Sequence, residues 1–158
     1  MSINHHTLRR PEWFAAAGLS VTTTRSASAV LPAPESLADE LAKALKSGQP
    51  LMVMVSLDGC PFCRVARDNY LEPMRRQESM PIFQIDMRSA AAVRDFNRVI
   101  VTHDQLVRAW KIKVAPTVLF FGSGGKEVAE RMEGAYIEDF YAAYLEQRIK
   151  ASRAAIKV

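Results

Sequence analysis

The two cysteines of the chain lie three residues apart, in Cys60-Pro61-Phe62-Cys63. Two thiols at this spacing, where a buried strand passes into a helix, can close into a small disulfide and reopen. Pro61 suits the first turn of a helix, where its missing N–H would have no intrahelical partner. Cys60 is then expected at the helix N-terminus, where the free N–H groups and the helix dipole favour a thiolate. The pattern predicts Cys60 as the nucleophile and Cys63 as the resolving thiol.

The same spacing has two other interpretations. A C-x-x-C pair can supply half of a zinc site, but a structural zinc site usually needs four ligands. The chain has no second such pair, and His5, His6 and His103 show no ligand spacing, so no metal is expected. An inert structural disulfide is the other alternative, and it would gain little stability because the loop that it closes is very short.

The composition is that of one soluble globular domain. At 158 residues, with 49% hydrophobic and 24% charged residues, the chain can bury a sizeable core. The formal net charge is +4, and no block of lysine and arginine marks a nucleic-acid surface, so no nucleic-acid partner is expected. No apolar run approaches the ~20 residues that a membrane helix needs, so stable membrane insertion is not expected once a leader is removed.

The first 29 residues resemble a secretory signal peptide. Arg9 and Arg10 belong to a basic start, Trp13–Val21 is a short apolar stretch, and Ala27-Ser28-Ala29 fits the small-x-small cleavage pattern. Cleavage after Ala29 would place the protein in the periplasm or another exported compartment. The alternative is an uncleaved leader on a cytoplasmic protein.

The elements that must position the cysteines follow from the apolar pattern. Residues 30–35 are expected as a proline-broken linker, residues 36–150 as one domain, and residues 151–158 as the basic end of its last helix. The pattern predicts helices at about 36–46, 60–73, 90–99, 102–110 and from 137 onward, and strands at about 51–55, 82–86, 117–121 and 127–132.

For several individual side chains the sequence predicts whether they are buried or exposed. Met52 and Met54 alternate with apolar neighbours on a strand and are expected in the core. Trp110 is expected in the core as well, whereas His103 is expected to be an exposed polar residue. The last helix should bury one face and end in solvated basic residues. That face comprises Ile137, Phe140, Tyr141, Tyr144, Leu145 and Ile149, and the basic residues are Arg148, Lys150, Arg153 and Lys157.

Taken together, the order of elements and two motifs resemble the thioredoxin superfamily over about residues 36–150. Cys60-Pro61-Phe62-Cys63 matches its redox centre, and Val114-Ala115-Pro116-Thr117 matches the segment that carries its cis-proline. The resemblance implies an α/β fold with a central mixed β-sheet flanked by helices on both faces. It also implies that Cys60 attacks a substrate disulfide and Cys63 releases the product. Pro116 would pack over the cysteines, and the backbone of Ala115 would pair with a substrate strand.

The chain departs from thioredoxin near the cysteines. Met54 stands where thioredoxin has a buried aspartate, and it cannot take a proton. Asp58 is nearby in sequence but is expected as a loop or capping residue, which leaves water to carry the Cys63 proton. Pro61 and Phe62 replace Gly-Pro and are expected to tune the reduction potential. Residues 87–104 are longer than a minimal thioredoxin needs.

The resemblance implies a thiol–disulfide oxidoreductase that acts on protein disulfides. It would use no cofactor beyond the Cys60–Cys63 pair and would depend on a membrane-bound or soluble electron donor. The chain has little room for the helical insertion domain of the best-known exported oxidase, which favours a reductase. The alternatives are an oxidase or isomerase of exported proteins, a thiol peroxidase, and a non-enzymatic module that binds a client or copper through the cysteines.

Overall fold

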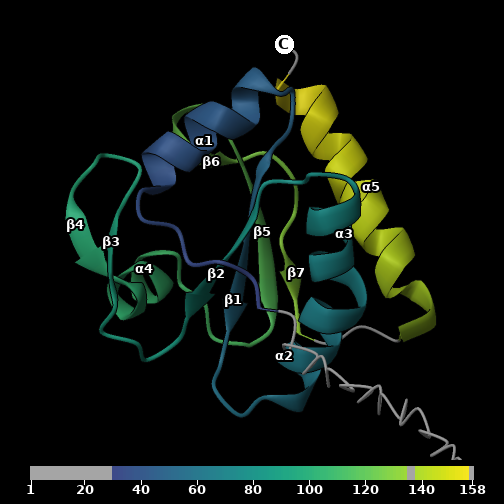
Figure 1. Cartoon of the computed structure of the whole chain (residues 1–158), viewed down its shortest axis with the longest axis horizontal. Coiled ribbons are helices and arrows are strands. Elements are labelled where there is room, and N and C mark those ends of the chain that lie inside the picture. The colour runs from purple at the N-terminus through teal and green to yellow at the C-terminus, as the bar shows by residue number, and fades with distance from the viewer. Residues whose placement is uncertain (1–29, 135–137, 157–158) are drawn as a thin grey trace, which may run out of the picture.

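The computed structural model describes residues 30–134 and 138–156 (Figure 1), so the predicted leader, Ile137 and Lys157 lie outside the described residues. The helical elements are α1 (Leu37–Lys46), α2 (Pro61–Ala66), the π-helical η1 (Arg67–Leu71), α3 (Glu72–Gln77), α4 (His103–Ala109), the 3₁₀ turn η2 (Ser123–Gly125) and α5 (Glu138–Ile156). The strands are β1 (Leu51–Ser56), β2 (Ile82–Asp86), β3 (Ala92–Arg94), β4 (Ile100–Thr102), β5 (Thr117–Gly122), β6 (Lys126–Glu127) and β7 (Met132–Glu133).

A mixed sheet forms the middle layer, in the order β2-β1-β5-β6, with β7 also pairing with β5. β1 runs parallel to β2 and antiparallel to β5. In Figure 1 the sheet lies between α1 and α4 on one side and α2, α3 and α5 on the other. The predicted fold class, a central mixed sheet with helices on both faces, is confirmed.

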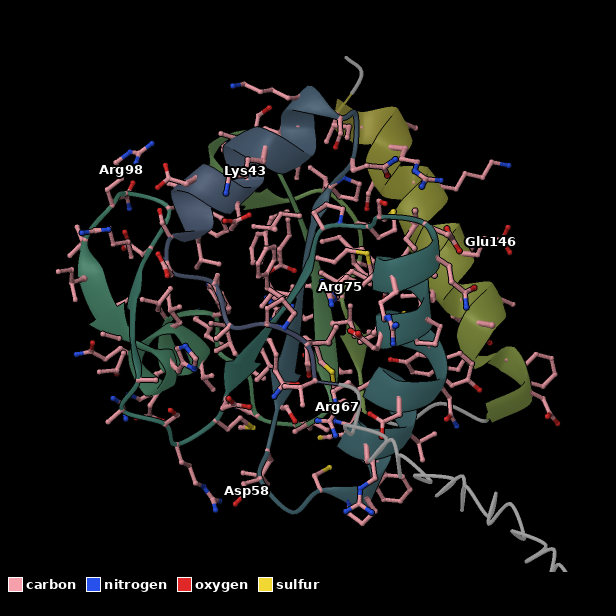
Figure 2. The ribbon with its side chains drawn as sticks, in the orientation of Figure 1. Lys43, Asp58, Arg67, Arg75, Arg98 and Glu146 are labelled. Carbon is pink, nitrogen blue, oxygen red and sulfur yellow. The ribbon has the colours of Figure 1, made fainter. Side chains whose placement is uncertain are left out.

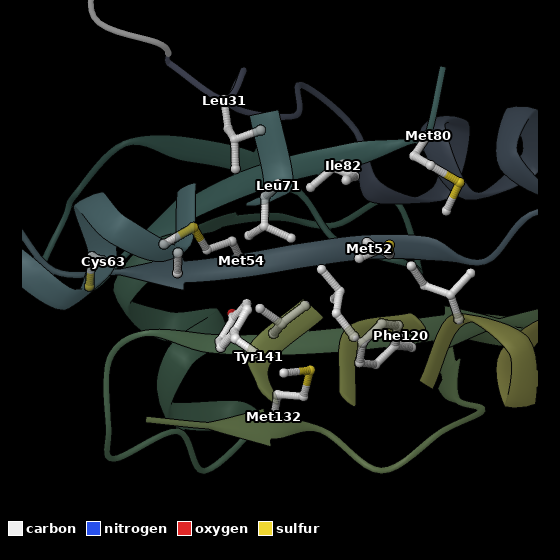
Figure 3. Close-up of a cluster of buried hydrophobic side chains, with 14 residues drawn as sticks. Leu31, Met52, Met54, Cys63, Leu71, Met80, Ile82, Phe120, Met132 and Tyr141 are labelled. Atoms are coloured by element: carbon white, nitrogen blue, oxygen red, sulfur yellow. The ribbon is translucent and has the colours of Figure 1, made fainter. Parts of the chain in front are cut away.

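The two cores of the domain lie on opposite faces of β1. Met52 and Met54 join the cluster under α2, α3 and α5, whereas Val53 and Val55 join the cluster under α1 and α4. This is the period-two alternation of a strand buried on both sides. Figure 3 shows the first cluster, with Cys63 at one end. The prediction that both methionines are core residues is confirmed.

The helix that carries the cysteines changes character before Pro73. Its first segment, α2, passes into the π-helical turn η1, and α3 then continues to Gln77. A proline inside a regular α-helix lacks a donor and crowds the carbonyl four residues earlier. The helix predicted at about 60–73 therefore does not end at Pro73 but passes through a wider turn directly before it and continues to Gln77.

The prediction of a helix at 90–99 is wrong. Residues 92–94 and 100–102 pair instead as the antiparallel hairpin of β3 and β4. The side chain of Asp95 accepts the backbone N–H groups of Asn97 and Val99, which closes the turn between the strands. β-branched residues on both arms favour the extended backbone over a helix.

The prediction that His103 is exposed is also wrong. Only 2% of its surface is exposed, and its Nδ1 accepts the backbone N–H of Asp86 at 3.2 Å. A capping box between Thr102 and Gln105 starts α4 within the range predicted for a helix, and this start places His103 against the end of β2. Trp110 packs on Phe121, with ring centroids 5.2 Å apart, in agreement with its expected core position.

The segment 30–35 is packed onto the domain rather than standing free of it. Leu31 is 2% exposed and lies in the same cluster as Cys63. The Pro32 carbonyl accepts the backbone N–H of Gln84 at 2.9 Å, and the Glu35 carbonyl accepts that of Arg94 at 3.0 Å. These bonds hold the segment beside β2 and β3.

The C-terminal part differs from expectation in three details. The return strand is split into β6 and β7. On α5 the side chains of Tyr141, Leu145 and Ile149 are buried, but Phe140 and Tyr144 are exposed, contrary to the prediction. Arg148 pairs with Glu130 and Arg153 donates to Gln49, so these two arginines are not free in solvent, whereas Lys150 is exposed. Over the described ranges, no helix is long and apolar enough to cross a membrane.

Candidate active site

Cys60 occupies the position predicted for it, at the start of the helix. It is the N-cap of α2, and Pro61 is the first helical residue. Its Sγ accepts the backbone N–H of Cys63 at 3.2 Å, which is the bond that a capping side chain makes. A thiolate in this place would receive a charge-assisted hydrogen bond at the positive end of the helix. Cys60 is therefore both a candidate reactive thiol and the N-cap residue of α2.

Cys63 is the inner of the two sulfurs. It is 1% exposed, whereas Cys60 is only half-buried, and both are free thiols. Burial, supported by the neighbouring Cys60 sulfur, raises the pKa of the Cys63 thiol to about 11, while the Leu57 backbone and the Ser56 hydroxyl act against this rise. Cys63 is therefore protonated at neutral pH, and Cys60 is the sulfur that solvent can reach.

The proline loop lies against the outer sulfur, although the two are far apart in sequence. The Ala115–Pro116 peptide bond is cis, and Cys60 Sγ lies 3.9 Å from the Ala115 carbonyl oxygen, to which it donates. The loop is held on both sides. The Thr117 hydroxyl donates to the Val114 carbonyl at 2.7 Å, and the Gly134 N–H donates to the Pro116 carbonyl at 2.8 Å. Pro116 is buried and Ala115 half-buried.

The fold therefore brings together Cys60, Cys63 and the loop of Ala115 and Pro116, as the sequence predicts. Phe62 points outward between the two cysteines and is 62% exposed, and Pro61 is exposed beside it. Val114, just before the cis bond, is 47% exposed. The outer sulfur thus has apolar, solvent-facing side chains on two neighbouring segments.

A groove beside the cysteines was not predicted from the sequence. It has a volume of about 770 Å³ and reaches both sulfurs, and it is walled by residues 56–60, by Arg64 and Arg67 of the helix, and by the end of β2 with the turn after it. Figure 2 shows Asp58 and Arg67 at this end of the molecule. The signal that could have found it is the alternation of Ile82, Gln84 and Asp86, since a strand that becomes polar on one face leaves the core there.

Hydrogen bonds fix the polar wall of the groove. Arg67 pairs with Asp68 at 2.9 Å and reaches the side-chain oxygen of Gln84 at 3.5 Å. Gln84 Nε2 in turn donates to Asp86 Oδ1 at 2.7 Å. In the part of the chain that the structure describes, no three histidine, cysteine, aspartate or glutamate side chains gather closely enough to hold a metal ion.

The chain was compared with known proteins. Residues 37–149 match the thioredoxin-like domain family, and no curated protein matches the sequence. The DsbH oxidoreductase is a structural neighbour with 18% identity and a TM-score of 0.52, covering 90% of this chain and 96% of its own. A thioredoxin-fold protein from Helicobacter pylori has 12% identity, a TM-score of 0.50, and coverages of 70% and 84%. Thioredoxin O2 from Arabidopsis thaliana has 16% identity, a TM-score of 0.49, and coverages of 77% and 96%.

At these identities the DsbH oxidoreductase and the Helicobacter pylori protein establish the fold and nothing beyond it. The family match is independent of them and spans most of the chain, including both cysteines and the cis-proline. The protein is therefore a member of the thioredoxin superfamily.

Proposed function

We propose that the protein is a thiol–disulfide oxidoreductase that reduces disulfides of other proteins through Cys60 and Cys63. One observation carries the proposal. An accessible sulfur caps a helix, a buried sulfur lies one turn behind it, and the cis-proline loop closes on the outer sulfur at 3.9 Å. An inert structural disulfide would need neither the difference in exposure nor the adjoining loop.

The reaction runs in two exchanges. The Cys60 thiolate attacks one sulfur of the substrate disulfide, forms a mixed disulfide with it, and expels the other substrate sulfur as a thiolate. Cys63 then loses its proton and attacks Cys60 Sγ, which forms the Cys60–Cys63 disulfide and releases the second substrate sulfur. The substrate gains two electrons and the protein loses two, so no bound cofactor is required. A membrane-bound or soluble thiol donor would restore the reduced state.

Substrate recognition is assigned to the surface around Cys60. The backbone of Ala115 would pair with an extended substrate segment, since strand addition uses main-chain groups and tolerates many sequences. The exposed Phe62 and Val114 flank that position and would contact apolar side chains of the substrate. Pro61 and Phe62 would also tune the reduction potential through the stability of the Cys60 thiolate.

The direction of the reaction and the cellular compartment are inferred from segments outside the cysteine site. Residues 87–104 add a short β-hairpin and the start of α4, not a helical insertion domain, which favours a reductase over an oxidase or isomerase. The leader-like residues 1–29 favour an exported, periplasmic protein, and an uncleaved leader would leave it in the cytoplasm.

Insulin reduction tests the activity. The reduced protein should reduce insulin, Cys60→Ser should abolish the reaction, and Cys63→Ser should accumulate a mixed disulfide that mass spectrometry detects. Equal activity in the wild type and Cys60→Ser would exclude the proposal. Equilibration with glutathione then gives the direction, because a potential near about −270 mV belongs to a reductase and one near about −120 mV to an oxidase.

A further inference from the structure

The face of the sheet under the cysteine helix changes from apolar to polar as it approaches Cys63. Residues directly opposite each other on paired strands project on the same face. At three successive levels of β1 and β2 the pairs are Met52 with Ile82, Met54 with Gln84, and Ser56 with Asp86. The methionines and Ile82 belong to the cluster that contains Cys63. Ser56 and Asp86 therefore lie on the Cys63 face, at its outer end.

This outer end is built as a fixed polar site. Ser56 is 3% exposed, and no buried side-chain nitrogen or oxygen among the described residues lacks a hydrogen-bond partner. One oxygen of the Asp86 carboxylate accepts from Gln84 at 2.7 Å, and the Asp86 backbone N–H donates to His103 at 3.2 Å. Ser56, Asp86 and Cys63 all line the same groove.

The second exchange, in which Cys63 attacks Cys60, requires a group that accepts the Cys63 proton. A thiol with a pKa of about 11 is ionised in only about one molecule in 10,000 at pH 7. Met54, directly beneath the cysteine helix, offers no proton acceptor, since it is fully buried in the apolar cluster. The Ser56 hydroxyl, by contrast, lines the same groove as Cys63 and acts against the rise in the pKa of that thiol.

We propose that Ser56 and Asp86 form the proton route of the resolving step, with Ser56 as the relay on the Cys63 face and Asp86 as the acceptor. The inference rests on the proposed function. In the mixed disulfide, Cys63 gives its proton to Ser56 Oγ, and the Ser56 hydroxyl proton passes to the Asp86 carboxylate. The Cys63 thiolate attacks Cys60 Sγ, the Cys60–Cys63 bond forms, and the bond from Cys60 to the substrate sulfur breaks. The departing substrate sulfur takes the electron pair of the broken bond and leaves as a thiolate. The proton held by Asp86 finally passes to this thiolate.

Other charged groups surround the acceptor. Arg64, Arg67 and Arg88 bring positive charge to the groove, His103 lies behind Asp86 as a neutral ring, and Asp58 is the other carboxylate on the wall. Asp58 belongs to the loop before Cys60, not to the paired strands, so it does not share a level with Ser56. It is the matched control for Asp86.

The experiment separates the two exchanges with a peptide disulfide. Stopped-flow measurement in the Cys63→Ser background gives the rate at which Cys60 forms the mixed disulfide. The chain with both cysteines gives the rate at which the second product leaves. Asp86→Asn and Ser56→Ala should leave the first rate unchanged and slow the second by about 100-fold or more at pH 7. The deficit should shrink about tenfold per pH unit as hydroxide takes over the deprotonation. Ser56→Thr, which keeps the hydroxyl, should retain most of the rate, and Asp58→Asn should match the wild type.

Circular dichroism and thermal unfolding establish that each variant is folded. If Asp86→Asn does not fold, Ser56→Ala alone tests the proton route. If the mixed disulfide forms but resolves at the same rate and with the same pH profile in wild type, Ser56→Ala and Asp86→Asn, the proton route is refuted while the proposed function stands. A loss in Asp58→Asn alone also refutes it. If no mixed disulfide forms at all, the proposed function itself fails.

Discussion

His103 should make the stability of the fold depend on pH, because the pKa of its ring is lowered in the folded protein. Its Nδ1 accepts the Asp86 backbone N–H at 3.2 Å, so the buried ring is neutral and carries its proton on Nε2. Burial lowers the pKa of His103 below 6.5, and the charge of Asp86 only partly opposes this effect. The unfolded chain therefore binds a proton at pH values where the folded chain still resists it. The contribution of the neutral His103 ring to the free energy of unfolding is complete above pH 6.5. It is lost as the pH falls from 6.5 toward the lower pKa of His103 in the folded protein.

Two substitutions separate the proton from the hydrogen bond. His103→Asn places an amide oxygen near the position of Nδ1 but does not titrate, whereas His103→Leu leaves the Asp86 N–H without an acceptor. An unsatisfied buried donor costs about 1–3 kcal/mol, so at about pH 8 His103→Leu should unfold more readily than His103→Asn by roughly that amount. The free energy of unfolding is measured by urea titration with circular dichroism.

The difference between wild type and His103→Asn is then followed as a function of pH. It should be constant above pH 6.5 and should shift in favour of the variant as the pH falls below it, because only the wild type has the ring to protonate. Effects of the carboxylates cancel in this difference. A difference that stays flat across the range, or a His103→Leu protein as stable as His103→Asn, would refute the reasoning.

Two further matched pairs test the local geometry. Gly125→Ala should destabilise the protein by about 1–3 kcal/mol more than Gly124→Ala, because both glycines have positive φ but only at Gly125 would the new Cβ meet the Phe96 ring, at 2.4 Å. Urea unfolding measures the pair, and equal losses would contradict the clash. Cys60→Ser and Cys60→Ala should both be inactive in insulin reduction, yet the serine variant should be more stable by about 0.5–2 kcal/mol, because serine can still cap α2. Thermal unfolding of the two variants checks this, and identical stabilities would show that the cap contributes nothing.

The features that could be predicted from the sequence are those that depend on a few residues close together in the chain. Pro61 after Cys60 marks a helix start, and Ser36 caps α1 by accepting the N–H of Asp39. Thr102 and Gln105 form the capping box that their spacing predicts. The cis-proline was predictable through the family resemblance, since its motif lies in four consecutive residues.

The features that were missed depend on contacts between distant segments. The short β3 and β4 strands take their shape from pairing with each other and with the segment before α1, not from a strong local pattern. The burial of His103 depends on the end of β2, which is 17 residues away. The groove wall likewise forms only when Ser56 and Asp86 meet across the sheet. No window of neighbouring residues contains that information.

The outer backbone of β2 is occupied. In a parallel pair every second N–H of an edge strand faces away from its partner, and an unsatisfied row of such groups invites strands of other molecules. On β2 the outward N–H of Gln84 is taken by the Pro32 carbonyl, and that of Asp86 by the His103 ring. The short segment before α1 and one imidazole thus leave the outer N–H groups of Gln84 and Asp86 unable to pair with a strand of another molecule.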